Sequence, residues 1–387
     1  MTDLTPKVKL STIVREWGRI GVTGFGGPPA HIVLFRRLCV EERNWLSARE
    51  FEDAIVATNL LPGPASTQLA IFCAWRVRGR LGGLIGGVCF ILPGLALILV
   101  LSVLFLAAHP PLWVLGAAGG AGACVPAVAL TAALRLVEPG WRHVHERKAA
   151  RIRWLIFILI GAVAAATLGA YLVVILVLGG LTELIILGGT NEKPITPSLA
   201  VLPVSVATAA VGGIAALSWV ALKVGALSYG GGFVIIPLMQ RDVVVTYHWM
   251  TGVQFLSAVA LGQVTPGPVV QTVAVVGYAA AGIGGALLAA LIAFAPSFCF
   301  VLGGASHFDR LRASERTQAF FRGAGAVVIG AIGGSALPLA RELTHEWQFA
   351  ILGLAVIWLV VIRRGIVTAL ISAGALGVIA VAAGAPH

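Results

Sequence analysis

Long stretches without a charged side chain are the feature that most limits how this chain can fold. No Asp, Glu, Lys or Arg occurs between Asp242 and Asp309, or between Arg80 and Arg135. A helix that crosses a bilayer needs about 20 consecutive apolar residues, whereas a helix on a soluble core keeps one polar face. These stretches have no such face, so we predict an all-α polytopic protein in a lipid bilayer, with about 10–13 membrane segments.

The charged residues are few, and most are basic. Lys and Arg number 27 against 16 Asp and Glu, a formal net charge of +11. They form short clusters between apolar segments, a pattern that sets orientation in a membrane rather than one that binds nucleic acid. The cysteines form no CxxC pair, and no phosphate-binding, GxSxG or HExxH motif occurs. We therefore expect no enzymatic activity, no cofactor, no metal site and no nucleic-acid partner.

The chain aligns with itself at one constant offset, so that the first half matches the second. The matching residues are rare or conformationally special: Gly26-Gly27 with Gly230-Gly231, Trp45 with Trp249, and Pro62-Gly63-Pro64 with Pro266-Gly267-Pro268. Such duplication is typical of transporters; the alternative is a duplicated scaffold that transports nothing. We assign residues 1–190 to an N-terminal repeat, 191–198 to a linker and 199–387 to a C-terminal repeat.

Basic clusters indicate that the two halves have opposite orientations. Arg76, Arg78 and Arg80 follow the first Pro-Gly-Pro segment, but the matching loop near 280–285 has no charge. Conversely, the arginines at 310–322 have uncharged counterparts at 106–118. If basic loops are cytoplasmic, the halves are inverted-topology repeats. Basic residues lie on both sides of segment 50–77, so 50–77 and 252–279 are either re-entrant hairpins or kinked full spans.

Broken helices are expected at four places. Each proline of a Pro-Gly-Pro triplet removes a backbone donor and disfavours helical geometry in the residue before it. Broken backbone is tolerated at membrane depth only inside protein or beside a wet cavity, so we predict a solute site at both triplets, with simple proline kinks as the alternative. The second pair of breaks is Gly26-Gly27 and Gly230-Gly231, for which close helix packing is the alternative. Continuous spans are expected near 84–108, 113–136, 154–169, 171–188, 199–216, 285–306, 321–341, 347–362 and 366–384.

Neutral polar side chains flank both triplets. They suit a tetrahedral oxyanion, and the helices that restart after Pro64 and Pro268 would present free N–H groups and positive dipole ends to it. For each side chain alone, an interhelical hydrogen bond is the simpler role. The candidate binding residues around the breaks are Gly26, Gly27, Asn59, Pro62, Gly63, Pro64, Thr67, Gln68, Gly230, Gly231, Gln263, Thr265, Pro266, Gly267, Pro268 and Gln271.

A basic residue recurs at one repeat position, as Arg19 and Lys223. No other charged residue occurs between Lys193 and Lys223, and a cation in such an apolar segment usually faces a cavity or pathway. We expect Lys223, together with Arg19, to supply positive charge to the anion. The alternatives are snorkelling to the membrane surface and, for Arg19, an i,i+3 pair with Glu16.

These motifs resemble the chromate ion transporter (CHR) family in its long, two-domain form. The resemblance rests on FGGP at 25–28, NLLPGPASTQLA at 59–70 and QVTPGP at 263–268, and it covers nearly the whole chain. It implies export of chromate across the cytoplasmic membrane of a bacterium by a secondary transporter, giving chromate resistance. Chromate and sulfate are similar tetrahedral dianions, so a transporter for sulfate or another oxyanion remains an alternative, as does a passive anion channel. A homodimer is left open.

Overall fold

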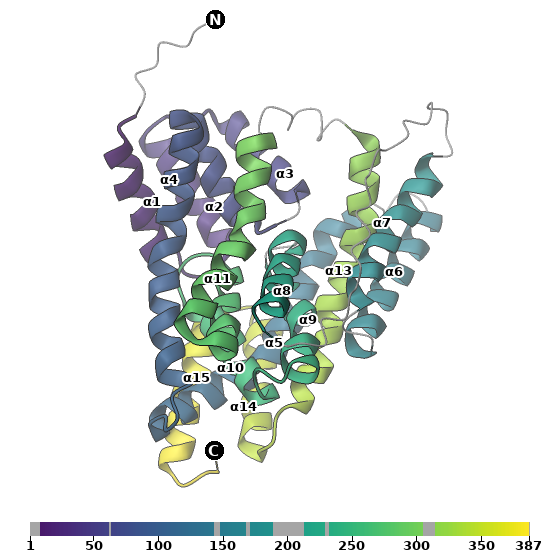
Figure 1. Cartoon of the computed structure of the whole chain (residues 1–387). Coiled ribbons are helices and arrows are strands. Elements are labelled where there is room, and N and C mark those ends of the chain that lie inside the picture. Colours follow the sequence, from purple (N-terminus) through teal and green to yellow (C-terminus); the bar gives the residue numbers. More distant parts are fainter. Residues whose placement is uncertain are drawn as a thin grey trace, which may run out of the picture.

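The structure is a computed structural model that describes residues 8–61, 63–142, 148–167, 171–188, 213–228, 232–304 and 314–386. Every regular element in these ranges is helical (Figure 1). The first half comprises α1 (Leu10–Thr23), α2 (Pro28–Arg36), η1 (Arg37–Glu42), α3 (Ala48–Leu60), α4 (Ala65–Phe105), α5 (Leu112–Arg142), α6 (Lys148–Thr167) and α7 (Leu172–Gly188). The second half comprises α8 (Ile214–Leu227), α9 (Ile235–Gln240), η3 (Arg241–Thr246), α10 (Gly252–Val264), η4 (Val269–Gln271), α11 (Thr272–Gly304), α13 (Glu315–Arg341), α14 (Glu346–Val356), η6 (Ile357–Val361) and α15 (Ile366–Ala382).

The two halves repeat the same local structure. The π-helix η1 begins at Arg37, and its counterpart η3 begins at Arg241, the residue with which the repeat aligns Arg37. The hydroxyl of Ser47 caps α3, as that of Thr251 caps α10, each within a capping box that satisfies two otherwise free N–H groups. The expected linker at 191–198 and most of the expected span at 199–216 lie outside the described residues.

Helix α4 contains a sharp turn at Gly79. Its 41 residues would exceed the thickness of a bilayer as one straight helix, but Gly79 takes φ 72° and ψ −164°. After this turn the chain folds back, because Gly86 packs against Ala74 and Gly87 against Ile71. Helix α11 turns in the same way at Gly282, with φ 62° and ψ −155°. Each element is therefore two antiparallel helices.

The segment with the first Pro-Gly-Pro is a re-entrant hairpin. The Glu50 carboxylate, at the start of α3, forms an ion pair with Arg76, near the end of the first section of α4. The two ends of segment 50–77 therefore lie side by side, and its tip is the Leu61–Pro64 loop. Helix α1 and the α2–η1 segment form another hairpin, with Glu16 paired to Arg43 across 3.0 Å at its base.

The halves are inverted-topology repeats. The second section of α4 and its counterpart in α11 pack antiparallel, with Gly83 against Leu302 and Gly87 against Phe298. Equivalent helices that run antiparallel are related by a two-fold axis in the membrane plane. Accordingly, α3 lies toward the upper end of the molecule in Figure 1 and its counterpart α10 toward the lower end.

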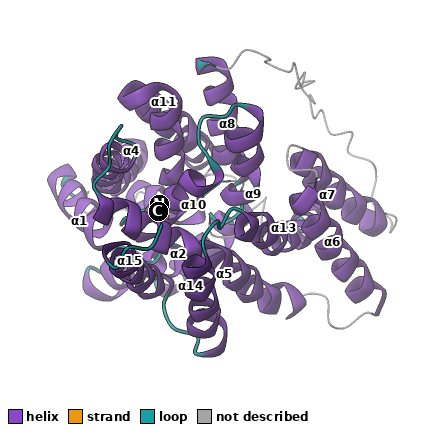
Figure 2. Ribbon diagram, turned by 90° about the horizontal axis from the view of Figure 1, so that it is seen from below, coloured by secondary structure: helices purple, strands orange, loops and turns teal. Residues whose placement is uncertain are grey.

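The remaining helices join the halves and meet the lipid. Helix α15 packs on α5 of the other half, and α7 packs on α13; Figure 2 shows α6 and α7 beside α13, away from α1 and α4. The helices long and apolar enough to cross a bilayer are Ala65–Phe105, Leu112–Arg142, Lys148–Thr167, Val269–Gly304 and Glu315–Arg341. Apolar side chains such as Leu159 and Ile185 are 64% and 71% exposed, as expected of a surface that faces acyl chains.

Candidate functional site

The first Pro-Gly-Pro loop is buried between the two halves. Gly63 has φ +123°, and a Cβ there would lie 2.6 Å from Gln68 Nε2, 3.0 Å from Ser297 Oγ and 3.4 Å from the Gly225 carbonyl oxygen. Thr67 and Gln68, on the first turn of α4, are fully buried. The loop thus meets α11 and α8 of the other half. Pro62 and the side chain of Asn59 lie outside the described residues.

The second Pro-Gly-Pro loop is buried as well, and it is held by hydrogen bonds to the first half. The Gly267 N–H donates to the Gly24 carbonyl across 3.0 Å, and Gln271 Nε2 donates to the Ile91 carbonyl across 2.9 Å. The Pro266 carbonyl lies against Gly94 of α4. All residues from Thr265 to Gly277 are buried. The chain therefore leaves helical geometry inside protein at both triplets, and neither triplet is a simple kink that faces lipid.

The polar side chains just before the second loop differ in what they bond. Thr265 Oγ1 donates to the Leu261 carbonyl across 2.5 Å, a bond within its own helix. The Nε2 atom of Gln263 is buried and has no hydrogen-bond partner among the described residues. The Gln263 amide nitrogen thus remains unbonded within the described residues, whereas the Thr265 hydroxyl bonds the backbone of its own helix.

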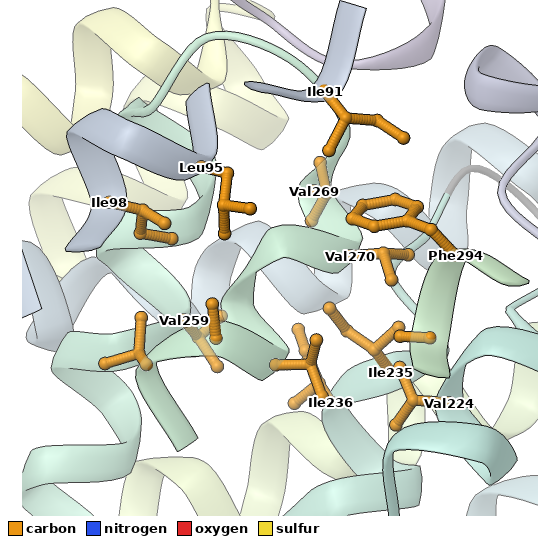
Figure 3. Packing of buried hydrophobic residues seen from close by; sticks show 14 of the residues in the cluster. Ile91, Leu95, Ile98, Val224, Ile235, Ile236, Val259, Val269, Val270 and Phe294 are labelled. Atoms are coloured by element: carbon orange, nitrogen blue, oxygen red, sulfur yellow. The ribbon is translucent and has the colours of Figure 1, made fainter. Parts of the chain in front are cut away.

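Apolar side chains fill the space beside the second loop. Figure 3 shows Val269 and Val270, which directly follow Pro268, among Ile91, Phe294 and Ile235. All of these side chains belong to the core that the two halves share. This side of the second loop is therefore apolar and close-packed, as protein cores are.

The glycine breaks lie next to this same loop. A Cβ added to Gly27, which has φ +71°, would lie 3.6 Å from Val269 Cγ2. A Cβ added to Gly232, which has φ +89°, would lie 3.4 Å from Val269 Cβ. Gly26 also has a positive φ, of 99°. Gly230 and Gly231 lie outside the described residues. The glycine segments of both halves therefore converge on Val269, directly after the second loop.

The two basic residues of the repeat have different surroundings. Lys223 Nζ forms an ion pair with Asp242, and the two residues are only 6% and 7% exposed. Arg19 is 57% exposed at its side chain and pairs with Glu16 at 3.0 Å and Glu42 at 3.8 Å. The i,i+3 pair of Arg19 with Glu16 is thus present, and the charge of Lys223 is balanced within the protein.

Sequence reasoning missed two residues of this region. Asp242 begins the uncharged stretch that ends at Asp309, but its contact with Lys223 depends on the hairpin that returns η3 to α8. Ser297 follows Pro296, which matches Pro93 of the first half, and that match was the available signal. No group of His, Cys, Asp and Glu that could hold a metal ion occurs among the described residues.

Comparison with known proteins agrees with the repeat and with the motifs. The sequence model of the chromate transporter family matches residues 11–184 and 215–378. The chain is 30% identical to a chromate transport protein of Cupriavidus metallidurans over 96% of this chain and 92% of the relative. It is 30% identical to one of Pseudomonas aeruginosa over the same shares, and 28% identical to a probable chromate transport protein of Synechococcus elongatus over 90% and 89%. No solved structure gives a significant match. The chain, with its two inverted halves and paired Pro-Gly-Pro loops, therefore belongs to the chromate transporter family.

Proposed function

We propose that this chain is a secondary transporter that exports chromate across the cytoplasmic membrane of a bacterium and so gives chromate resistance. The observation that carries the proposal is the burial of both broken loops between inverted halves. Broken backbone in that position is the usual place of a transporter's solute site. Named relatives are chromate transport proteins, and we take this chain likewise to be a transporter and not an enzyme.

The chemistry of the loops suits an oxyanion. Helix α4 restarts at Ala65 directly after the first loop, and its free N–H groups and positive dipole end favour an anion. Gln68, Thr67 and Gln263 add neutral donors. We further propose that Lys223 exchanges part of its contact with Asp242 for the anion during transport, while Arg19 attracts anions at the exposed base of its hairpin.

Flux measurements test this proposal. Purified protein is reconstituted into vesicles of defined orientation, and chromate and sulfate fluxes are followed with and without a proton gradient. We expect saturable chromate flux that responds to the gradient and is faster in the exporting direction. Saturable flux of sulfate alone would replace chromate as the solute, and conductance without saturation or coupling would indicate an anion channel.

Two proline variants link the flux to the loops. Pro266→Ala, in the second loop, should reduce chromate flux strongly because it removes one of the two breaks and lets α10 extend into the loop. Pro338→Ala is the matched control, since Pro338 lies inside α13 and outside both loops. Equal chromate flux by the two variants and the unmodified chain would show that transport does not depend on the second loop, and no flux by any of the three would indicate a scaffold that transports nothing.

A further inference from the structure

The two Pro-Gly-Pro loops differ at one equivalent position. Each loop is covered by the residue that follows the matched proline of the opposite half: Ser297, after Pro296, covers Gly63, and Gly94, after Pro93, covers Pro266. A serine stands over one loop and a glycine over the other. The loops therefore have different partners although their own sequences are the same.

Ser297 does not bond its own helix. Its Oγ is buried, has no hydrogen-bond partner among the described residues, and lies 3.0 Å from the Cβ position of Gly63. Other hydroxyls on the helices donate to the carbonyl three or four residues back: those of Ser102, Thr131, Thr167, Thr182, Ser218 and Ser335. The Ser297 hydroxyl thus lacks this common bond and points at the first loop. A buried hydroxyl without a partner destabilises the protein, and a hydrogen bond to a ligand would remove that penalty.

A second hydroxyl near the first loop, that of Thr67, is also buried without a hydrogen-bond partner among the described residues. Thr67 lies on the turn that restarts α4, is 0% exposed, and its Oγ1 has no partner within the described part of the chain. Gln68 Nε2 lies 2.6 Å from the same Cβ position at Gly63 that Ser297 approaches. Donors from both halves therefore converge on Gly63, directly before the positive end of a helix. The Gly225 carbonyl, an acceptor, lies farther away, at 3.4 Å from that position.

The second loop is bonded to the opposite half by its own donors. A Cβ on Gly94 would collide with the Pro266 carbonyl oxygen and lie 2.5 Å from Gln271 Oε1, so α4 is packed directly on the loop. The amide of Gln271 and the N–H of Gly267 are already bonded to carbonyls of the first half. This loop is held by the protein itself.

We propose that the chain binds one oxyanion at a time, at the first Pro-Gly-Pro loop, and that the Ser297 hydroxyl of the second half donates a hydrogen bond to it. This inference rests on the proposed function and makes it more specific: the two-fold related loops are a binding loop and a bracing loop. The anion contacts Ser297, Thr67 and Gln68 together with the N-terminus of α4. Both halves are therefore needed for one site.

The test is the chromate dependence of flux in oriented vesicles and the binding of chromate and sulfate to the purified protein by calorimetry. Ser297→Ala should raise the half-saturating chromate concentration about ten-fold or more, the usual effect of losing a hydrogen bond to a charged group, without lowering the temperature of unfolding. Thr67→Val, which keeps the shape and removes the hydroxyl, should act in the same direction. Binding should saturate at one anion per chain.

Ser335→Ala is the matched control, because this buried serine on α13 bonds the Ile332 carbonyl of its own helix at 2.7 Å. Its half-saturating concentration should equal that of the unmodified chain. If the unmodified chain transports chromate but Ser297→Ala is indistinguishable from Ser335→Ala, the assignment of Ser297 is wrong and the proposed function stands. Two bound anions per chain would overturn the single-site assignment, and no flux of any oxyanion by the unmodified chain would overturn the proposed function itself.

Discussion

Replacing one member of the buried Lys223–Asp242 pair should be far more damaging than replacing both. Lys223 and Asp242 are 6% and 7% exposed, so Asp242→Asn leaves an ammonium group in the interior without its counter-ion. Breaking a buried pair in this way costs about 3–5 kcal/mol. A typical protein has only about 5–15 kcal/mol of stability. We expect Asp242→Asn and Lys223→Met each to lower the temperature of unfolding sharply.

The double variant Lys223→Met/Asp242→Leu removes both charges and leaves apolar groups of similar length. Replacement of a buried ion pair by apolar residues is often neutral or stabilising, so the double variant should recover most of the lost stability. The assay is thermal unfolding of the purified protein in detergent. Arg37→Met is the control, because Arg37 is 69% exposed in its pair with Glu42 and such a surface pair contributes less than about 1 kcal/mol. Single variants as stable as this control would refute the reasoning.

The same double variant separates a structural role of Lys223 from a role in binding the solute. If Lys223 contacts the anion, the stable double variant should still fail to transport chromate in the vesicle assay. If the pair only stabilises the α8–η3 hairpin, chromate flux should return together with stability. Returned flux would remove Lys223 from the proposed site.

Other predictions concern single contacts. Gly94→Ala should destabilise the protein by about 1–3 kcal/mol through overpacking against the Pro266 carbonyl. Gly353 is a helical glycine whose added Cβ would meet nothing within 4 Å, so Gly353→Ala should stabilise the protein by about 0.5–1 kcal/mol. Thermal unfolding measures both effects. Gly79→Ala should cost about 1–2 kcal/mol from its positive φ alone, by the same measurement. Backbone and Arg76 hydrogen bonds lower the pKa of Glu50 from its ordinary 4.5, so the small stability advantage over Glu50→Gln should be complete above pH 4.5 and vanish as the pH falls through the lowered pKa.

The break positions could be predicted because residue type alone dictates them. A proline cannot continue the ladder of helical hydrogen bonds, and α3 and α10 end at Leu60 and Val264, directly before the two Pro-Gly-Pro loops. The choice between a re-entrant hairpin and a kinked span could not be made in the same way. It depends on whether the chain reverses at the loop, which the Glu50–Arg76 ion pair between the two ends of segment 50–77 reveals, and a proline triplet fixes a break in the helix without fixing the direction of the next helix.

Contacts between hairpins were beyond sequence reasoning for a related reason. Asp242 is 19 residues from Lys223 along the chain. Many residues at a similar separation from Lys223 do not contact it, so separation alone does not identify the partner. Only the return of the chain between α8 and η3 brings the Asp242 carboxylate back to Lys223. The basic residue could be found because charge is rare in such a segment, but its partner required the folded backbone.

Duplication explains why the sequence indicates two sites although we propose only one. Both halves carry the same break, and each break frees backbone groups that need partners at membrane depth. At the second loop the protein supplies them, because Gly94 lets α4 approach and the Ile91 and Gly24 carbonyls accept bonds from the loop. At the first loop Ser297 stands where Gly94 stands at the other, and its hydroxyl has no partner among the described residues. Under the single-site proposal, this difference at one equivalent position turns a symmetric scaffold into a protein with one place for an anion.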